Sequence, residues 1–451
     1  MEYQEAAEFL LDLRRFGVSP GIESVRELLA ELDDPHDGLT VVQIAGSNGK
    51  GSTARMVESC LREAGYRVGL YTSPHLDDLR ERIRVDGRKI PRAAVASFVE
   101  RVRPTLVERA AEGEPLTFFE AMTALALDRF DRAGCDVAVL EVGLGGRYDA
   151  TSVADPAAAA VTNVSLEHTS VLGDTVEAIA AEKAAVAPEE RPLVTAAAGD
   201  ARDALAGSGA DLVTVGEAAS DDVRVAYGGR TDGAEARVEL DGDGWRVETR
   251  IPLLGACQAR NAGVAAALVR QVAADLDRGR GGEGAGTDSD ASIDPATVER
   301  GLRGAHWPGR FEVIERAPLT VLDGAHNPGA CAATATTLAE FDHDDLHVVF
   351  AAMHEKDHAG MVAALPSPTS VVTCAPTLDR AEDPAVLAGV WERETDAAVE
   401  VGDAVADALR AARARAGADD CVLVVGSLFA VAEARRRWTR SARPVAAGDG
   451  D

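Results

Sequence analysis

The sequence predicts an α/β protein with two domains, each containing a mostly parallel β-sheet. Three observations lead to this prediction. Short apolar runs alternate with amphipathic segments of helical spacing along most of the 451 residues, and the spacing changes to that of antiparallel strands between 221 and 252. A polar, glycine-rich stretch then interrupts the pattern before it restarts. We therefore expect a larger N-terminal domain at 1–277, a flexible linker at 278–293, a smaller Rossmann-like domain at 294–440 and a disordered tail at 441–451.

The charge of the chain limits its partners. Its 75 acidic and 46 basic residues give a formal net charge of −29, so nucleic acid and anionic membranes would repel it. Only four basic residues are lysines: Lys50, Lys89, Lys183 and Lys356. An acidic chain almost without lysine suggests adaptation to high salt, where screening weakens self-repulsion. Because arginine supplies the other cations, a remaining lysine is expected where a compact ammonium or an amine nucleophile is needed.

The sequence also indicates a cellular compartment. No apolar run is long enough to cross a bilayer, and the N-terminal segment is acidic instead of carrying the basic region of a signal peptide. The six cysteines are scattered without CxxC spacing, which is typical of small buried side chains and not of a zinc site or a disulfide framework. We expect a soluble, cytoplasmic protein.

The first strand of the N-terminal domain is expected at 41–45, after lead-in helices within 1–38. It enters a loop, Gly46-Ser47-Asn48-Gly49-Lys50-Gly51-Ser52, which an amphipathic helix follows at once. Such a loop suits a polyphosphate, because glycines let the backbone approach, a lysine adds charge and a hydroxyl can reach Mg²⁺. The strict Walker A pattern fails, since Ile44 stands at its first glycine and Gly51 follows Lys50. An ordinary glycine-rich turn is the alternative.

Further polar residues follow the next predicted elements. A strand at 67–72 leads to Ser73-Pro74 and a polar loop at 77–89, and helices are expected at 92–112 and 119–133. A buried strand at 136–140 ends at Glu141, and a strand at 158–164 precedes His168. A helix at 174–187 carries Lys183 toward the same edge; Asp174 and Glu177 have capping-box spacing at its start.

These residues share one position in the predicted sheet. The carboxyl ends of parallel strands meet at one edge, so Lys50, Ser52, Ser73, Glu141 and His168 are expected to lie close together. A hydroxyl, a carboxylate and an imidazole beside a phosphate loop suit Mg²⁺, which keeps waters and takes substrate oxygens as ligands. Taken singly, each has a simpler explanation as a turn residue or a hydrogen-bonded buried histidine. Their common position is what favours a site.

The rest of the chain completes the two domains. Alternating residues between 221 and 252 predict an antiparallel flap, and a helix at 256–276 closes the first domain. In the second domain the expected strands lie at 311–315, 319–322, 346–351, 369–374, 398–401 and 421–425. The second of these opens into a polar cluster, Asp323-Gly324-Ala325-His326-Asn327, again at the carboxyl end of a strand.

Taken in order, these motifs carry a family resemblance. The series resembles folylpolyglutamate synthase/dihydrofolate synthase, of the Mur-ligase-like amide ligases, from the first helices to Gly426-Ser427-Leu428. The motifs are Gly46 to Ser52, Thr72-Ser73-Pro74-His75-Leu76 with Arg80-Glu81-Arg82-Ile83, Glu141-Val142-Gly143-Leu144-Gly145-Gly146 with Asp149, His168 with Leu172-Gly173 and Lys183, Gln258 with Asn261-Ala262, Trp307-Pro308-Gly309-Arg310 and Asp323 to Asn327. The family's loop has the Asn-Gly-Lys-Gly-Ser form, which accounts for the departure from Walker A.

The resemblance implies an ATP-dependent ligase. Such an enzyme joins L-glutamate to dihydropteroate or to the terminal glutamate of a reduced folate, through an acyl phosphate and with release of ADP and phosphate. It also implies two Mg²⁺ ions, a carbamylated Lys183, K⁺ as a further cation, and a monomer whose partners are small molecules. Carbamylation requires an amine nucleophile, which arginine cannot provide, so the scarcity of lysine agrees with this role for Lys183.

The resemblance also carries residue roles, with Lys50, Lys183 and His168 as the catalytic group. ATP binding is implied for Asn48, Gly49, Lys50, Gly51, Ser52, Asn261, Arg310, Asp323 and His326; closure of the second domain would complete this site. The metal ions would be served by Ser52, Ser73, Glu141, His168 and Lys183. Ser73, Pro74 and Arg82, in a loop that closes over folate, and Thr117 and Phe119, in the pterin-side pocket, would bind the acceptor. A place in the core is the alternative for Phe119.

Three matters stay open at this stage. Lys356 resembles a family segment that faces the site, but no finer role follows, and Lys89 is expected at the surface. A ligase of the same superfamily acting on a muramyl or other peptide shares the nucleotide and metal sites. A non-catalytic nucleotide-binding switch is the alternative from another class, although it leaves Lys183 and the second-domain cluster unexplained.

Overall fold

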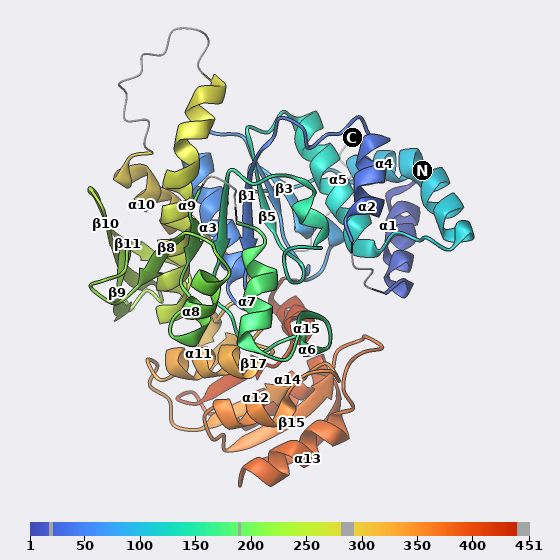
Figure 1. Cartoon of the computed structure of the whole chain (residues 1–451). Helices are drawn as coiled ribbons and strands as arrows, with labels where there is room; N and C mark the ends of the chain where they lie inside the picture. Colours follow the sequence, from blue (N-terminus) through green and yellow to red (C-terminus); the bar gives the residue numbers. More distant parts are fainter. Residues whose placement is uncertain (18–20, 188–190, 281–292, 440–451) are drawn as a thin grey trace, which may run out of the picture. The chain divides into compact units, whose positions relative to one another are not determined.

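The structure, a computed structural model, describes residues 1–17, 21–187, 191–280 and 293–439. It contains two compact units (Figure 1). Unit 1 comprises Met1–Thr231, Glu235–Pro252 and Ala256–His306. Unit 2 comprises Asp232–Ala234, Leu253–Gly255 and the chain from Trp307 onward. The predicted two-domain α/β architecture is confirmed.

Unit 1 is built on an 11-stranded sheet with the order β11-β10-β9-β8-β7-β6-β1-β5-β2-β3-β4. The strands from β9 to β2 are parallel, whereas β10 and β11 form an antiparallel flap at one edge, as predicted. The strand bounds are β1 Thr40–Ala45, β2 Val68–Tyr71, β3 Ile83–Val85, β4 Arg88–Lys89, β5 Val137–Glu141, β6 Ala158–Val161, β7 Leu193–Thr195, β8 Leu212–Gly216, β9 Val223–Arg230, β10 Ala236–Gly242 and β11 Trp245–Ile251.

The opposite edge of this sheet differs from the prediction. The segment 77–89, predicted as a polar loop, contains the short 3-10 helix η2 (Leu79–Arg82) and the hairpin β3–β4. β3 pairs antiparallel with β2, with Tyr71 opposite Ile83. The polar composition hid a strand of three residues, of which only Ile83 is fully buried. As a result, Arg82 lies beside the carboxyl end of β2.

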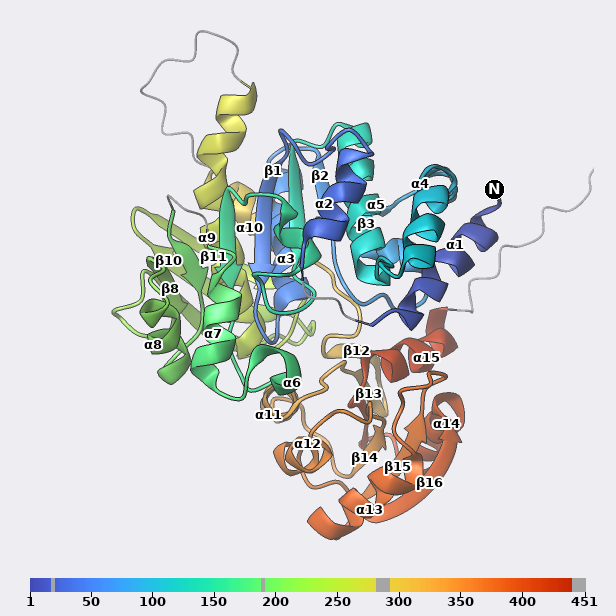
Figure 2. The same cartoon turned by 45° about the vertical axis from the view of Figure 1, so that its right-hand side comes forward.

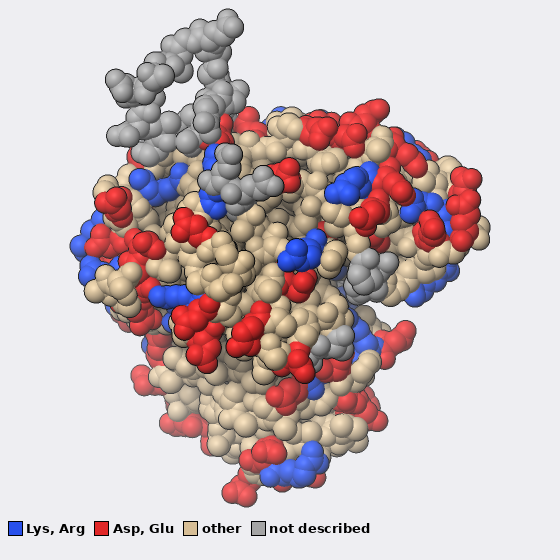
Figure 3. All heavy atoms as spheres, in the orientation of Figure 1, with Lys and Arg blue, Asp and Glu red and all other residues tan. Residues whose placement is uncertain are grey.

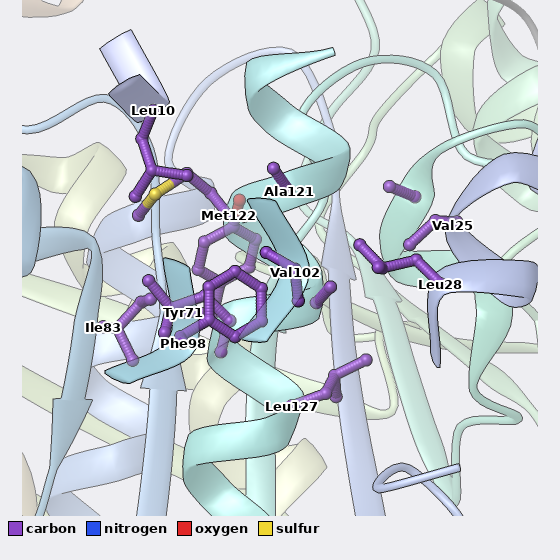
Figure 4. Close-up of a cluster of buried hydrophobic side chains, with 14 of the residues drawn as sticks. Leu10, Val25, Leu28, Tyr71, Ile83, Phe98, Val102, Ala121, Met122 and Leu127 are labelled. Carbon is purple, nitrogen blue, oxygen red and sulfur yellow. The ribbon is translucent and has the colours of Figure 1, made fainter. Parts of the chain in front are cut away.

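Helices cover both faces of the sheet (Figures 1 and 2). On one face α3 packs against α9 and α10; on the other, α5 packs with α1, α2 and α4. The helical bounds are α1 Tyr3–Asp12, η1 Leu13–Arg15, α2 Glu23–Ala30, α3 Lys50–Glu63, α4 Arg92–Glu112, α5 Phe118–Ala133, η3 Ala150–Val153, α6 Thr169–Leu172, α7 Val176–Ala184, α8 Asp200–Gly207, α9 Ala256–Arg280 and α10 Pro295–Arg303. A cluster of buried side chains from α1, α2, α4, α5 and the sheet forms a core, part of which Figure 4 shows around Met122 and Tyr71.

The start of α7 is a second correction. Asp174 and Glu177 were predicted to form a capping box, but the helix begins at Val176, and the Thr175 hydroxyl accepts a hydrogen bond from Ala178 N at 3.2 Å. Thr175 has the extended backbone conformation of an N-cap, and its hydroxyl serves as well as a carboxylate. The predicted N-cap, Asp174, is therefore one residue before the observed one, Thr175, and Lys183 still lies within the helix.

The units divide at His306, not at the predicted 294, because α10 belongs to unit 1. α10 packs against α3 and β11. A Cβ on Gly301 would collide with the backbone of Cys60, so only glycine allows this approach, and the Cys60 thiol donates to Val298 O at 3.6 Å. Most of the predicted linker, at 281–292, and the predicted tail at 441–451 lie outside the described residues.

Unit 2 contains a six-stranded sheet with the order β12-β13-β17-β14-β15-β16, in which only β12 is antiparallel to its neighbour. All six strands fall where the sequence predicts them. The bounds are β12 Glu312–Arg316, β13 Leu319–Leu322, β14 Leu346–Phe350, β15 Ser370–Ala375, β16 Ala398–Ala404, β17 Cys421–Val425, α11 Pro328–Leu338, α12 His358–Ala364, α13 Pro384–Glu394, α14 Val405–Arg415 and α15 Leu428–Thr439. Phe350 and Trp391 meet edge to face in its core, 5.4 Å between centroids.

Other general predictions can be compared with the structure. All six cysteines are free, and all except Cys257 are buried, as expected of small apolar side chains. Within the part of the chain that the structure describes, no helix has the length and apolar character needed to span a membrane. Acidic side chains are spread over the face shown in Figure 3, with fewer basic ones between them.

Candidate active site

A loop of small residues joins β1 to α3. Gly46 and Gly49 have φ angles of 137° and 85°, which favour glycine. A Cβ on Gly46 would collide with the Thr162 side chain, and one on Gly49 would lie 2.6 Å from Asn261 Oδ1. Both positions therefore require glycine, and Asn261 of α9 lies directly against the loop.

The loop is held by the segment that follows β6. Asn48 N donates to Asn163 Oδ1 at 2.9 Å, and Asn163 Nδ2 donates to Asn48 O at 3.1 Å. The Thr162 hydroxyl donates to the same carbonyl at 2.6 Å. Ser47 Oγ accepts from Ser165 N at 3.0 Å. The conformation of the loop is thus fixed by the residues that follow β6, and the sequence analysis did not identify Thr162 or Asn163 in this role.

Lys50 begins α3 and turns back over the loop. Its Nζ donates to Gly46 O at 2.9 Å and to Ser47 O at 3.3 Å. Gly51 and Ser52 follow in the first helical turn, and both are buried. The first backbone N–H groups of a helix lack intrahelical acceptors, so the ammonium and the helix N-terminus form a local positive potential at the loop.

The hydroxyl of Ser52 is available for a ligand. Ser52 is 1% exposed, and within the described residues its Oγ has no hydrogen-bond partner. The neighbouring Thr53 Oγ1 is also buried, and it too has no hydrogen-bond partner within the described residues. A buried hydroxyl without a partner costs free energy unless something else binds it. This chemistry fits a hard cation such as Mg²⁺ beside a phosphate group.

Glu141 and Ser73 are brought together by strand register. Ile44 of β1 pairs with Glu141 of β5, and β5 pairs on its other side with β2, which leads into Ser73. Glu141 Oε2 accepts from Ser73 N at 2.8 Å, and Glu141 is 5% exposed. The Ser73–Pro74 peptide bond is cis. The predicted convergence of the phosphate loop, Glu141 and Ser73 at one strand edge is therefore present.

Lys183 lies in the interior with a carboxylate partner that the sequence analysis missed. Lys183 Nζ donates to Glu167 Oε1 at 2.9 Å, and the side chains are 2% and 10% exposed. Burial lowers the pKa of Lys183, although Glu167 opposes this. Burial also opposes ionisation of Glu167, but Lys50 and Lys183 outweigh it and lower the pKa of that carboxyl to about 2. Glu167 is thus an anion on which both lysines act. The sequence offered one indication of this role, because Glu167 directly precedes His168 in the segment that follows a predicted strand.

His168 is less enclosed than the sequence suggested. The residue is exposed and has a φ of 47°, in the left-handed region, so it is not a buried core histidine. No group of three or more His, Cys, Asp or Glu side chains within the described residues is arranged to hold a metal ion. The predicted metal set contains only Glu141 and His168 of these types, and its other members are hydroxyls and Lys183.

Asp149 orders the turn that follows β5. Its carboxylate accepts from Gly143 N and Leu144 N at 2.9 Å each, and from the Thr151 hydroxyl at 2.6 Å. Burial raises its pKa, while these hydrogen bonds act in the opposite direction. The glycine-rich segment after Glu141 is therefore a hydrogen-bonded turn, and the acid at its end organises it.

Thr117 and Phe119, which were predicted to bind the acceptor, lie at the start of α5. The Thr117 hydroxyl and Glu120 form a capping box at the start of α5, so the Thr117 side chain is engaged in the helix N-terminus. The ring of Phe119 lies 5.7 Å from that of Tyr71, and a Cβ on Gly143 would collide with it. Phe119 is thus packed at the strand edge next to the turn after Glu141.

Arg82 is buried at the same edge. It is 7% exposed, and its guanidinium carbon lies 5.0 Å from the ring centroid of Phe118. Arg82 Nε donates to His75 Nδ1 at 2.9 Å. Burial lowers the pKa of Arg82 to about 10 and, together with Arg82, lowers that of His75 to about 3.

The predicted cluster of unit 2 follows β13. Asp323 accepts from Phe311 N at 2.8 Å and from Ala325 N at 2.7 Å; burial raises its pKa, and Arg310 opposes this. His326 Nδ1 lies 2.9 Å from Gly324 O. Arg310, Asp323 and His326 are therefore neighbours within unit 2, as their motifs suggested. Lys356 is partly exposed before α12.

Comparison with known proteins identifies the family. The model of the Mur ligase middle domain matches residues 44–269, and that of the Mur ligase glutamate ligase domain matches residues 309–428. A dihydrofolate synthase/folylpolyglutamate synthase of Bacillus subtilis is 30% identical over 96% of this chain and 99% of its own. The chain belongs to the folylpolyglutamate synthase/dihydrofolate synthase family of Mur ligases. The resemblance found in the sequence is confirmed.

More similar members of this family come from halophilic organisms. A relative from Haloferax volcanii, named a probable bifunctional folylpolyglutamate synthase/dihydropteroate synthase, is 61% identical over 98% of this chain. The chain spans about half the length of that relative, 51%. The halophilic character predicted from the acidic charge and the scarcity of lysine agrees with the similarity to relatives from halophiles.

Solved structures of the family have the same architecture. The Mycobacterium tuberculosis folylpolyglutamate synthase complexed with ADP is 30% identical, with a TM-score of 0.84 and coverage of 98% of this chain and 99% of that one. Escherichia coli FolC in complex with DHPP and ADP is 30% identical, with a TM-score of 0.79 and coverage of 97% and 98%.

Proposed function

We propose that the protein is an ATP-dependent amide ligase that adds L-glutamate to dihydropteroate, to folylpolyglutamate or to both. The observation that carries the proposal is the phosphate loop with its buried, unpaired Ser52 hydroxyl and the enclosed Glu167–Lys183 pair near Lys50. The family's names and its complexes with ADP and DHPP support the nucleotide and the acceptor. The chain would correspond to the folylpolyglutamate synthase part of the longer halophile relatives, because it matches the Bacillus subtilis relative nearly end to end.

The carboxylate of the acceptor does not react with an amine until one of its oxygens has been converted into a good leaving group. A carboxylate oxygen of the acceptor attacks the γ-phosphorus of ATP, the bond to the β–γ bridging oxygen breaks, and ADP leaves. The amine of glutamate then attacks the acyl carbon of the acyl phosphate, and inorganic phosphate leaves with the formation of the amide. Two anions must meet in the first step, so positioning and charge neutralisation are the main contributions of the protein.

On this proposal, the loop and its lysine bind the nucleotide. The N–H groups of Asn48 to Ser52 would face the phosphates, and the Lys50 ammonium would exchange its carbonyl partners for phosphate oxygens. Asn261 would contact the nucleotide from α9. Within unit 2, Arg310, Asp323 and His326 are assigned to nucleotide binding by their family motifs.

Two Mg²⁺ ions would neutralise the charge that develops on the phosphates, with K⁺ as a further cation. Ser52, Ser73, Glu141, His168 and Lys183 would hold the divalent ions. For Lys183 this requires carbamylation, in which the neutral amine attacks dissolved CO₂, forms an N–C bond and releases one proton. Burial, which lowers the pKa of Lys183, favours the reactive neutral amine.

A single assay tests the proposal. Purified protein is given ATP, Mg²⁺ and labelled glutamate, with dihydropteroate and tetrahydrofolate offered separately, and phosphate and labelled product are measured. We expect phosphate release only when acceptor and glutamate are both present. Turnover with a muramyl peptide instead would identify a different ligase of the superfamily, and nucleotide binding without turnover would indicate a switch.

A further inference from the structure

Glu167 is not among the residues assigned to ATP, the metal ions or the acceptor, yet both lysines of the site act on its carboxylate. Lys183 Nζ donates to Glu167 Oε1 at 2.9 Å, and the side chains of Glu167 and Lys183 are 10% and 2% exposed. Burial opposes ionisation of Glu167, but Lys50, Lys183 and the Ser47 hydroxyl lower its pKa to about 2. Glu167 is therefore an enclosed anion that contacts Lys183 and lies close to the phosphate loop.

Carbamylation of Lys183 would reverse the charge beside Glu167. The ammonium first loses one proton. The lone pair of the neutral amine then forms an N–C bond with dissolved CO₂, one C–O π pair moves to oxygen, and a second proton is released to solvent. The lysine side chain thus changes from a cation to an anion, and the two side chains together change from a neutral pair to two negative charges. Enclosed anions at this distance repel each other strongly unless a cation neutralises them.

The two anions would lie close enough together to bind one ion. A carbamate oxygen is about 2.3 Å from the lysine nitrogen, so it would lie within about 5 Å of Glu167 Oε1. Oxygen ligands of one Mg²⁺ lie about 3 to 4 Å apart, and carboxylate oxygens are among the ligands that this ion prefers. Lys50 would not be the neutralising cation, because on the proposed function its ammonium binds phosphate oxygens.

We propose that Glu167 is a further ligand of a divalent cation, which it holds together with carbamylated Lys183. The inference rests on the proposed function and deepens it, because it adds a residue to the five already assigned to the metal ions. Carbamylation and Mg²⁺ binding then favour each other, and each raises the affinity for the other by the same factor. In the alternative role Glu167 only neutralises the Lys183 ammonium, and its removal favours the carbamate equally with and without Mg²⁺.

The carbamate can be measured without turnover. Wild type and variants, free of nucleotide, are equilibrated at one pH with increasing ¹³C-labelled bicarbonate, with and without saturating MgCl₂, and the carbamate carbon is measured by NMR. Lys183→Arg identifies the signal, because this variant should lack it. We expect Mg²⁺ to lower the CO₂ concentration for half-carbamylation of the wild type about 100-fold, which is within the range of coupled sites.

Glu167→Gln separates the two roles. Without Mg²⁺ the variant should form the carbamate at a lower CO₂ concentration than the wild type, because the repulsion between two anions is removed. The effect of Mg²⁺ should fall to about 10-fold or less, as for the loss of one group that holds a metal ion. Glu182→Gln is the matched control. Glu182 directly precedes Lys183, but its side chain lies 3.5 Å from Arg147 and is 30% exposed, so the wild-type effect of Mg²⁺ should be kept.

An unchanged effect of Mg²⁺ in Glu167→Gln overturns the assignment of Glu167. If that variant does not fold, Glu167→Asp decides, since it keeps the charge but withdraws the carboxylate by one bond length, and it should reduce the effect of Mg²⁺ at least about 3-fold. Phosphate release with acceptor and glutamate is measured on the same wild-type preparation. Turnover without a Mg²⁺-dependent carbamate refutes this inference alone, whereas a Mg²⁺-dependent carbamate without turnover refutes the proposed reaction.

Discussion

Glu167 and Lys183 form a hydrogen-bonded ion pair of 2.9 Å that is almost completely enclosed, and Lys50 is the second cation acting on the same carboxylate. The pair joins the segment after β6 to α7. It places a lysine with a lowered pKa beside the phosphate loop, in a chain that uses lysine at only four positions.

Lys183→Arg tests the carbamate directly. Arginine keeps the positive charge but cannot react with CO₂, so the metal ligand would be lost and turnover should fall by about 1,000-fold. Wild-type activity should also depend on added bicarbonate, and a carbamate carbon should be visible by NMR after labelling with ¹³CO₂. The control is Lys89→Arg, at a half-exposed lysine near Asp78 and Glu81. Unimpaired turnover of Lys183→Arg would refute the carbamate.

Glu167→Gln should change the pH dependence of stability. The folded-state pKa of Glu167 lies below its unfolded value of 4.5, at about 2, so its contribution is present above pH 4.5 and is lost as pH falls toward 2. At neutral pH the variant should be less stable by an amount on the order of 3 kcal/mol, and the difference should vanish near pH 2. Chemical denaturation at several pH values measures this. A difference independent of pH would show that the pair does not act through charge.

The same substitution should affect Lys183. Glu167 raises the pKa of Lys183 against the effect of burial, so its removal favours the neutral amine. Carbamylation, followed by ¹³C NMR at fixed CO₂, should then begin at a lower pH than in the wild type. A shift to higher pH would contradict the assigned interaction.

Ser52→Ala should separate metal binding from stability. The hydroxyl makes no hydrogen bond with the described residues, so its loss should change the free energy of unfolding by less than about 0.5 kcal/mol. The Mg²⁺ concentration needed for half-maximal turnover should rise about 10- to 100-fold. Thr53→Val, at the adjacent buried hydroxyl, is the matched control. If only the Thr53 variant loses Mg²⁺ affinity, the ligand is Thr53 instead.

Salt should raise both stability and activity. A net charge of −29 causes self-repulsion that is weakened at about 1 M KCl, where the Debye length is about 3 Å. We expect the Tm and kcat to increase from dilute buffer to that concentration. A protein that is most stable and most active in dilute buffer would contradict adaptation to salt.

The sequence predicts the sheets well because the spacing of apolar residues, which locates the strands and helices, is a local property of the chain. Glu141 and Ser52 could be located from a strand end and a loop motif. Glu167 could not, since its role depends on a contact with Lys183 16 residues later in the chain. Arg82 required the short strand β3, whose three residues give too brief a pattern to distinguish from a loop. The position of α10 depended on the contact of Gly301 with Cys60, which no local pattern encodes.

The packing of α10 on α3 has a consequence for the connectivity of the protein. The helices on both sides of the segment 281–292 belong to unit 1, so a protease that cuts there would not separate the two units. The C-terminal fragment would stay attached through α10 after the covalent bond is broken. The covalent continuity of the chain between α9 and α10 is therefore not what joins unit 2 to unit 1.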